Sequence, residues 1–380
     1  MLIFLTVLQF VFIIAIVVYL AINTWFLVKV EPAAGPLPAC PFVSVCVPAR
    51  NEERDIEACL TSLLNQNYPH FEVIVVDDNS TDNTPRIIKS LQERHANLIA
   101  IQGAALPADW YGKPFALYQA AQKAQGELLL FTDADPVFQR YALTTAVHLM
   151  QKHRLDMISL LPGAEFGSFW ERVVQPVIFA FIAALTRFKK VNDPESPDAM
   201  GVGAFILLQR EVYDRVGGHA TLKQAILEDI GMAHLVKQSG AHIMIADARK
   251  IYDIRMYHSF REIWIGWRKN VFLAMKKSIF KTLYYILCVL GFMVTPWLMV
   301  GVHLWVGSGL GWQAMALAGL GLVLITKWAL CHELNLEKYY ALLFPLGALV
   351  MVAIMINSMI HVLVRGRAEW RGRTYSQPER

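Results

Sequence analysis

The sequence predicts an α/β domain with a doubly wound, mainly parallel sheet, flanked by one N-terminal and two to three C-terminal transmembrane helices. Apolar residues make up 55% of the 380 residues and charged residues only 17%, against a usual charged share of about 25%. The charge is missing mainly from residues 2–28 and 283–364, whereas residues 40–282 have an ordinary composition and alternate between strand and helix patterns. This composition excludes a disordered chain, a collagen and a disulfide scaffold.

The N-terminal segment predicts a retained membrane anchor over residues 1–30. Residues 2–28 contain no ionisable side chain apart from Tyr19. As a helix they would measure about 40 Å, more than the ~30 Å of a hydrocarbon core. A signal peptide would start with basic residues and have a shorter apolar run. Here Met1 is followed directly by Leu-Ile-Phe, and no basic residue precedes the apolar run.

The C-terminal region, residues 283–364, divides into three apolar segments, 283–306, 310–330 and 339–364. Each is close to the ~20 residues that a span requires. Lys29 follows the first span, and a basic tail over residues 365–380 follows the last one. The positive-inside rule therefore predicts that the segment after the first span and the C-terminal tail are both cytoplasmic. Because three full spans would place the tail outside, one segment could be re-entrant or interfacial. The candidates are the segment with Pro296 and the second segment, which is rich in small residues.

The middle region predicts parallel strands joined by helices. Strand patterns cover residues 43–47, 72–76, 98–101 and 128–131. Helix patterns cover residues 55–64 and 114–124, and Thr81 is expected to cap a third helix that ends near Arg94. This alternation is typical of a doubly wound sheet, which binds ligands outside the carboxyl ends of its strands.

The polar clusters of the sequence fall at those strand ends. Asp133 and Asp135 follow the strand at 128–131, and hard oxygen ligands of this kind suit Mg²⁺ or Mn²⁺ completed by phosphate oxygens. Asp78 follows the strand at 72–76, and Arg50 and Glu52 follow the first strand. These groups could contact a nucleotide, or they could be ordinary turn residues and helix caps.

Two further motifs carry candidate chemistry. Lys113 lies near the start of a predicted helix, where the helix dipole disfavours a cation, so a phosphate or carboxylate partner is expected. Glu228 and Asp229 lie in a predicted helix over residues 225–237. They are either exposed acids at a helix N-terminus or include a general base. The glycines Gly201 and Gly203 lack the third glycine of a dinucleotide site and predict a tight turn.

Taken together, these motifs resemble the family 2 glycosyltransferases, which have the GT-A fold and use nucleotide-diphosphate sugars. The resemblance covers about residues 43–270 and rests on the following stretches: Pro48-Ala49-Arg50-Asn51-Glu52-Glu53, Val75-Val76-Asp77-Asp78-Asn79-Ser80-Thr81-Asp82, Asp133-Ala134-Asp135 and Glu228-Asp229. Trp110-Tyr111-Gly112-Lys113, the flanking spans and the tail at 370–375 look like a membrane subgroup that acts on lipids. That subgroup includes hopene-associated and carotenoid (diaponeurosporenoate-type) enzymes.

The resemblance implies a role for each candidate residue. Glu52 and Asp78 would bind the nucleotide, with Pro48 and Arg50 beside them. Asp135 would hold the divalent metal, Mg²⁺ or Mn²⁺, with Asp133 supporting it. Asp229 would be the general base next to Glu228, and Lys113 with the metal would neutralise the leaving diphosphate. A single displacement would invert the configuration of the sugar.

One departure from the superfamily predicts transfer of a single sugar. Processive polysaccharide synthases carry a Gln-x-x-Arg-Trp motif after the base, and the corresponding stretches, residues 252–258 and 264–270, lack it. Four nearby residues could contact the diphosphate or the metal, or could be surface charge: Arg255, His258, Arg268 and Lys269. Helices near 166–188 and 260–281 are expected to lie at the membrane surface.

The predicted function is therefore transfer of one sugar, most simply from a UDP-sugar, to a hopanoid, carotenoid or other polyprenoid lipid. The catalytic domain, residues 40–282, is expected on the cytoplasmic side of the inner or plasma membrane. The net charge of +4 gives no reason to expect a nucleic-acid partner. A processive polysaccharide synthase and a non-catalytic nucleotide-binding subunit are the alternatives.

Overall fold

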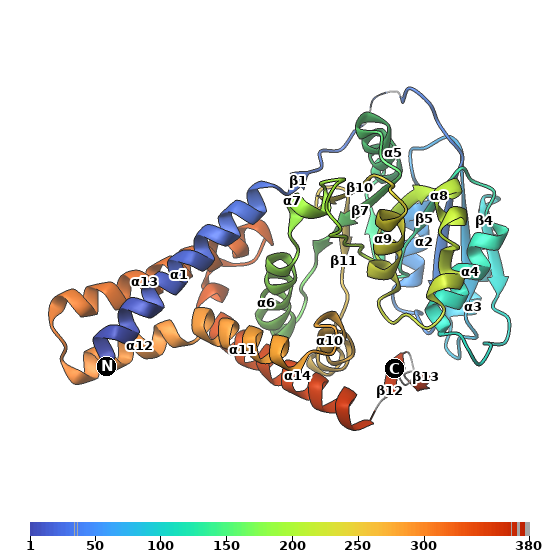
Figure 1. Ribbon diagram of the computed structural model, residues 1–380. Coiled ribbons are helices and arrows are strands. Elements are labelled where there is room, and N and C mark those ends of the chain that lie inside the picture. Colours follow the sequence, from blue (N-terminus) through green and yellow to red (C-terminus); the bar gives the residue numbers. More distant parts are fainter. Residues whose placement is uncertain (34, 36, 366, 371–372, 377–380) are drawn as a thin grey trace. The chain divides into compact units, whose positions relative to one another are not determined.

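The computed structural model describes residues 1–33, 35, 37–365, 367–370 and 373–376. The chain divides into two compact units (Figure 1). The sheet unit comprises residues 27–165 and 187–256, and the helical unit comprises residues 1–26, 166–186 and 257–380. The helices at 169–185 and 260–274 thus group with the apolar helices rather than with the sheet.

The sheet unit is built on one large, mainly parallel sheet, as the sequence predicts. Its described strands run in the order β1-β10-β7-β9-β5-β2-β3-β4. Strand β9 alone is antiparallel to its neighbours β5 and β7 among the described pairs. The strands are β1 (Val28–Lys29), β2 (Val43–Ala49), β3 (Phe71–Asp77), β4 (Leu98–Gln102), β5 (Leu128–Phe131), β7 (Met157–Leu161), β9 (Ile206–Gln209) and β10 (Ile243–Asp247).

The centre of this sheet follows from its apolar, β-branched strands. Every residue of β2 is buried, as expected for a parallel strand that is covered on both faces. Val45 aligns with Val73 of β3 on one side and with Leu130 of β5 on the other. This register brings the carboxyl ends of β2, β3 and β5 to one edge of the sheet. A second small sheet contains β6 (Pro136–Phe138), β11 (Tyr252–Ile254) and β8 (Gly163–Ala164).

Four helices of the sheet unit correspond to the segments predicted near 55–64, 81–94, 114–124 and 225–237, with shifted ends, and the other described helices of this unit were not predicted. The α-helices of this unit are α2 (Ile56–Leu64), α3 (Thr84–Gln92), α4 (Gly112–Lys123), α5 (Ala142–His153), α7 (Phe188–Val191), α8 (Arg210–Arg215) and α9 (Glu228–Gln238). The prediction that Thr81 caps α3 is wrong, because the helix begins at Thr84 after Asn83. Pro85 explains the shift, since proline is favoured in the first turn of a helix, where its missing N–H is not needed.

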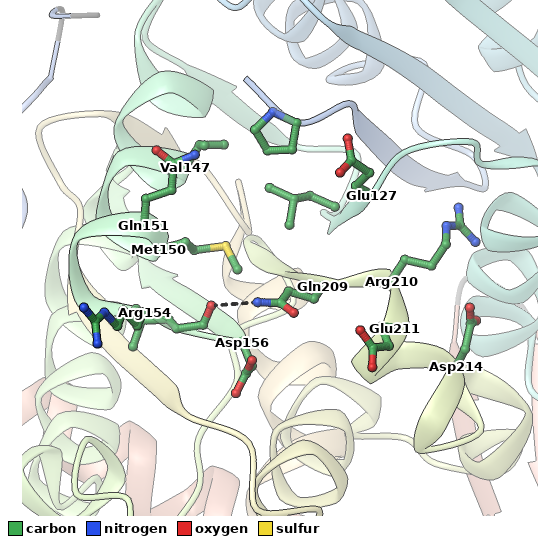
Figure 2. Close-up of a pocket in the computed structure, with 13 residues that line it drawn as sticks. Glu127, Val147, Met150, Gln151, Arg154, Asp156, Gln209, Arg210, Glu211 and Asp214 are labelled. Carbon is green, nitrogen blue, oxygen red and sulfur yellow. Dashed lines mark hydrogen bonds between the residues drawn. The ribbon is translucent and has the colours of Figure 1, made fainter. Parts of the chain in front are cut away.

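A cavity of about 930 Å³ lies at the opposite, amino-terminal edge of the parallel strands (Figure 2). Its lining includes Leu128 at the start of β5, Gln209 at the end of the antiparallel β9, and Asp156 just before β7. The cavity is therefore on the far side of the sheet from the predicted ligand edge.

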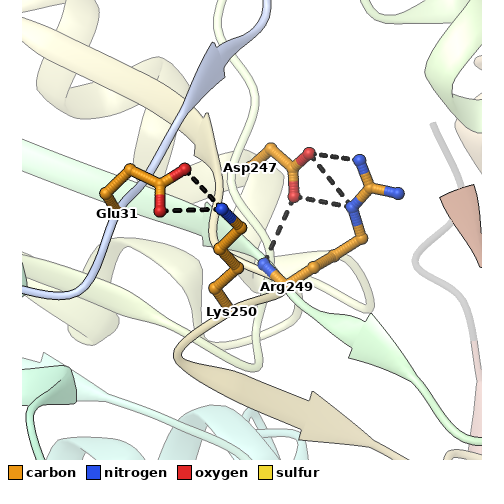
Figure 3. A network of polar contacts seen from close by, with 4 residues as sticks. All are labelled: Glu31, Asp247, Arg249 and Lys250. Carbon is orange, nitrogen blue, oxygen red and sulfur yellow. Dashed lines mark hydrogen bonds and ion pairs between the residues drawn. The ribbon is translucent and has the colours of Figure 1, made fainter.

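The edge strand β1 is held by the residues that follow it. Val30 N donates to Asp247 O at 2.8 Å, and Lys250 Nζ lies 2.5 Å from Glu31 Oε1. Beside them Arg249 pairs with Asp247 through both carboxylate oxygens (Figure 3). The short strand thus continues the sheet beyond β10.

Among the described residues, three helices of the helical unit are long and apolar enough to cross a membrane: α1 (Leu2–Trp25), α13 (Leu310–Glu333) and residues 344–364 of α14 (Phe344–Arg365). A fourth candidate is the pair α11 (Ile279–Met293) and α12 (Thr295–Val306), which is bent by 50° and could be a broken span or a re-entrant loop. The break lies next to Pro296, as the sequence suggests, because proline cannot continue the helical hydrogen-bond ladder. Figure 1 shows α1 and α12 beside α13.

Polar side chains join the helices of this unit. Thr6 of α1 lies 2.7 Å from His303 Nε2 of α12, and Gln9 donates to Thr295 at 2.7 Å. Asn23 donates to the backbone oxygens of Ala183 and Thr186, next to the end of α6 (Phe169–Leu185). Such bonds fix helix pairs where hydrophobic contacts alone are not selective.

The C-terminal tail is described only in part. Backbone pairing joins β12 (Arg367–Trp370) to β13 (Arg373–Ser376) in antiparallel register. Residues 366, 371, 372 and 377–380 of the predicted basic tail 365–380 lie outside the described residues.

Candidate active site

Four charged side chains meet at the carboxyl edge of the sheet. Lys113 is the second residue of α4, and Asp133 lies two residues beyond β5. Glu228 and Asp229 are the first two residues of α9. The structure thus brings together Lys113 and Glu228, which are 115 positions apart in the sequence.

Lys113 is the centre of this cluster. Its ammonium lies 2.5 Å from Asp133 Oδ1 and 2.6 Å from Glu228 Oε1. Burial alone would lower the pKa of Lys113, but the carboxylates of Asp133, Glu228 and Asp229 outweigh it and raise this pKa well above its usual value. The lysine therefore carries a fixed positive charge. Its carboxylate partners compensate for the unfavourable position of a cation at a helix start.

Asp229 is held by two backbone donors. Gly203 N donates to its Oδ2 at 3.0 Å, and Ile230 N donates to its Oδ1 at 2.8 Å. Burial, with a smaller effect from the Glu228 carboxylate, raises the pKa of Asp229 from 3.8 to about 6. A carboxylate with this pKa is a stronger base than an exposed aspartate and is still mostly ionised at neutral pH.

Gly201 and Gly203 are required by close packing rather than by a positive φ. A Cβ atom at Gly203 would lie 2.9 Å from Lys113 Nζ and 3.1 Å from Asp133 Oδ2. A Cβ atom at Gly201 would overlap the backbone oxygen of Asp229. The charged cluster thus packs directly against the backbone of Gly201-Val202-Gly203. The sequence pattern did not reveal this role.

The predicted nucleotide residues form a second group at the same edge. Arg50 Nη1 donates to the backbone oxygens of Asp78 at 2.5 Å and Asn79 at 3.1 Å. Asp78 is 1% exposed, and Glu52 is also buried. Glu52 N donates to Thr84 Oγ1 at 2.8 Å, so the loops after β2 and β3 are fixed to each other. Pro48 lies within the buried strand β2, one residue before its end.

Comparison with known proteins identifies the domain. Residues 44–217 match the family model described as Glycosyl transferase family 2. These residues form a family 2 glycosyltransferase domain.

One relative and one solved structure match most of this chain. The 4,4'-diaponeurosporenoate glycosyltransferase of Staphylococcus aureus is 25% identical over an alignment of 353 positions, and the match covers 88% of this chain and 88% of that protein. A mannosyltransferase of Pyrobaculum calidifontis, solved with GDP-Man and Mn²⁺, has 19% identity and a TM-score of 0.57. The match covers 96% of this chain and 99% of that one, and it supports the GT-A fold.

Two acids of the glycosyltransferase domain, Asp133 and Asp135, are the candidates for holding a divalent cation. The described residues contain no group of three or more His, Cys, Asp or Glu side chains that could hold a metal ion. Asp133 and Asp135 do share one environment, because both contribute, after burial, to raising the pKa of Cys59 and of Tyr252. Two carboxylates match the usual protein share of a Mg²⁺ or Mn²⁺ shell in phosphate-transferring sites.

Sequence reasoning missed His219, which packs against Phe131 of β5 and is affected by the charge of Lys113. His219 is buried, and its Nδ1 lies 3.0 Å from the Tyr213 hydroxyl. Burial, and then the charge of Lys113, lowers the pKa of His219 to about 3, so the ring is neutral. The preceding glycines, Gly217 and Gly218, have positive φ, and this Gly-Gly pair was the available signal of a strained turn.

The four candidate diphosphate contacts are divided between the units. Arg255 follows β11 in the sheet unit, whereas His258, Arg268 and Lys269 belong to the helical unit. His258 N donates to Glu262 Oε2 at the start of α10 (Phe260–Ala274), and the backbone oxygen of Arg268 accepts from Ser358 of α14. A diphosphate role for these four residues stays a prediction.

Proposed function

We propose that this chain transfers a single sugar from a nucleotide-diphosphate sugar, a UDP-sugar in the first instance, to a lipid. The acceptor group is a hydroxyl or carboxyl group of a hopanoid, carotenoid or other polyprenoid. The observation that carries the proposal is the Lys113 ammonium held between Asp133 and Glu228, with Asp229 fixed beside them by Gly203 N. This arrangement offers a cation for the leaving group and a base for the incoming one.

The residues divide the reaction between them. Glu52 and Asp78 would bind the nucleotide, and Arg50 would keep their loops in place through the backbone of residues 78 and 79. Asp229 would take the proton from a lipid hydroxyl group while the oxygen of that hydroxyl group forms a bond to the anomeric carbon of the sugar. The bond from that carbon to the diphosphate breaks on the opposite side, so the configuration inverts, and Lys113 would stabilise the departing charge.

A divalent cation fits this scheme. Asp135 and Asp133 would hold Mg²⁺ or Mn²⁺, which when bound neutralises charge on the leaving diphosphate. The Mn²⁺ in the P. calidifontis mannosyltransferase supports a metal in this fold.

The acceptor and the location rest on the apolar helices and the relative. A carotenoid-type name for a relative with 88% coverage supports a lipid acceptor. Helices that can span a membrane would keep the domain at the surface of the bilayer in which such lipids are dissolved. We place the sheet unit on the cytoplasmic side of the inner or plasma membrane, where nucleotide sugars are made.

Membranes that contain the full chain, supplied with labelled UDP- and GDP-sugars, test the proposal. Mass spectrometry of the lipid extract should show one added sugar, and a ladder of products would instead indicate a processive synthase. Mild alkali separates the two linkages, because an ester to a carboxyl group is cleaved and a glycoside to a hydroxyl group survives. For an alkali-stable product, Asp229→Asn should reduce transfer at least 100-fold, and unchanged transfer would refute the base. The matched control is Asp214→Asn, an exposed acid in the lining of the far cavity.

A further inference from the structure

We propose that Lys327 and the start of α14 form a binding site for the phosphate of an anionic membrane phospholipid. The site lies wholly within the helical unit. It goes beyond sugar transfer and rests only on the proposed membrane location.

Lys327 is an unusual residue for its position. It belongs to α13, one of the helices apolar enough to cross a membrane. The side chain is 2% exposed, and Nζ has no hydrogen-bond partner among the described residues. A buried ammonium without a partner is costly, and ionisable groups inside spanning helices usually mark a functional site.

The N-terminus of α14 lies close to this ammonium. Its Nζ lies 6.0 Å from the ring centre of Phe344, the first residue of the 22-residue helix α14. The dipole of a long helix places positive charge at that end. Pro345 has no N–H, and the N–H groups of Leu346 and Gly347 already bond to Leu343 O. The attraction for an anion therefore comes from the dipole and the ammonium rather than from free amide groups.

Two cations near the turn between α13 and α14 are engaged by other groups. Lys338 Nζ lies 4.3 Å from the ring centre of Trp328. Arg172 of α6 donates to the Tyr340 hydroxyl at 3.4 Å and lies 3.9 Å from Glu337. Glu337 is thus engaged by Arg172. The other acid near this turn is Glu333, the last residue of α13.

Exposed aromatic residues place this turn at the level of lipid headgroups. Trp328 is 47% exposed and Tyr339 is 58% exposed, and tryptophan and tyrosine are enriched where membrane meets water. Lys327 lies six residues before the end of α13, about 9 Å along the helix. Because Nζ of Lys327 is buried, the lipid phosphate would have to enter between α13 and the start of α14 to reach it. Basic pockets between spanning helices are known to bind anionic headgroups.

The experiment compares lipid retention by the purified full chain in native mass spectrometry. The protein is exchanged into nanodiscs of phosphatidylcholine with or without phosphatidylglycerol, and a third sample contains phosphatidylcholine and inorganic phosphate. The variants are Lys327→Met, which keeps the stem, and Lys327→Arg, which keeps the charge. Lys338→Met is the control for loss of an exposed cation on the same turn.

The wild type and Lys338→Met should each retain phosphatidylglycerol, and Lys327→Met should retain it at least tenfold less. Lys327→Arg should restore most of the retention. The melting temperature of the wild type, but not of Lys327→Met, should rise when phosphatidylglycerol is present. Because Lys327→Met replaces a charge with an apolar group, it is not expected to unfold the helices.

Three outcomes would overturn the site. Equal retention by the wild type and Lys327→Met would show that Lys327 does not bind the lipid. An equal effect of Lys338→Met would indicate general surface attraction, and an equal thermal shift with inorganic phosphate would show that a free anion occupies the site. Failure of the wild type to enter nanodiscs would instead refute the membrane location itself.

Discussion

Replacing Asp229 by asparagine should stabilise the protein at neutral pH while it removes the base. The folded state raises the pKa of this carboxyl from 3.8 to about 6. Between these values the folded protein binds a proton that the unfolded chain releases, so the group's contribution to stability is complete below pH 3.8 and is lost as the pH rises through 6. An asparagine at this position has no such loss, and its oxygen can still accept from Gly203 N.

The size of the effect follows from the shift. A rise of about 2 pH units corresponds to about 3 kcal/mol in the free energy of unfolding. The attraction of Lys113, which lowers the pKa of Asp229, is already contained in this net shift. We therefore expect a gain of about 3 kcal/mol, on the order of 2–4 °C in melting temperature per kcal/mol for a domain of this size.

The assay is thermal unfolding of the purified full chain with a chelator present, for the wild type and Asp229→Asn, at several values from pH 4 to pH 8. The difference in melting temperature should be small near pH 4 and should grow in favour of the variant up to about pH 7. Asp214→Asn should show no such trend. A variant that is less stable than the wild type at pH 7.5, or a difference that does not change with pH, would refute the reasoning.

Four further predictions concern the same cluster. Lys113→Met leaves the buried Glu228 carboxylate without its cation and should lower stability by about 3 kcal/mol, toward the low end for a broken buried pair, as measured by thermal unfolding. Gly203→Ala should reduce transfer at least tenfold, because its Cβ displaces Lys113 and Asp133, as measured by initial rates. The rate with a hydroxyl acceptor should fall about tenfold per pH unit below about 6, as Asp229 becomes protonated. Chelation should abolish transfer, and added Mn²⁺ or Mg²⁺ should restore it.

Each of these has a matched control or a contrary result. Lys113→Arg keeps the charge and should lose less stability than Lys113→Met. Gly311→Ala, at a glycine where a Cβ would meet nothing within 4 Å, should leave transfer unchanged. A flat rate between pH 5 and pH 7 would contradict the role of Asp229. Full activity in a chelator would contradict the metal.

Much of the fold was predictable because the central strands are continuous apolar runs. Burial on both faces leaves β2 and β3 no alternative to a sheet interior, and each ends at a polar cluster. The edge position of Asp78 and Asp133 follows from that parallel arrangement alone. The break near Pro296 was predictable in the same way, from the missing N–H of proline.

Other features depend on contacts between distant segments. No local pattern marks β9 as antiparallel, since its four residues read like any buried strand. The partners of Lys113 could be named only by chemical class, because Glu228 lies 115 positions away in the sequence. The sequence pattern around Gly203 predicts only a turn. The close approach of Lys113 to this glycine arises when the domain packs, so no local pattern reveals it.

The two-residue strand β1 has a practical consequence for anyone who shortens the chain. A cut after residue 30, the natural place to remove an apolar anchor, would also remove Val28 and Lys29 and uncover the edge of β10. Unpaired strand edges recruit other strands and promote aggregation. A shortened protein that begins before Val28 and keeps Glu31 for Lys250 is therefore the better starting point for soluble expression and crystallisation.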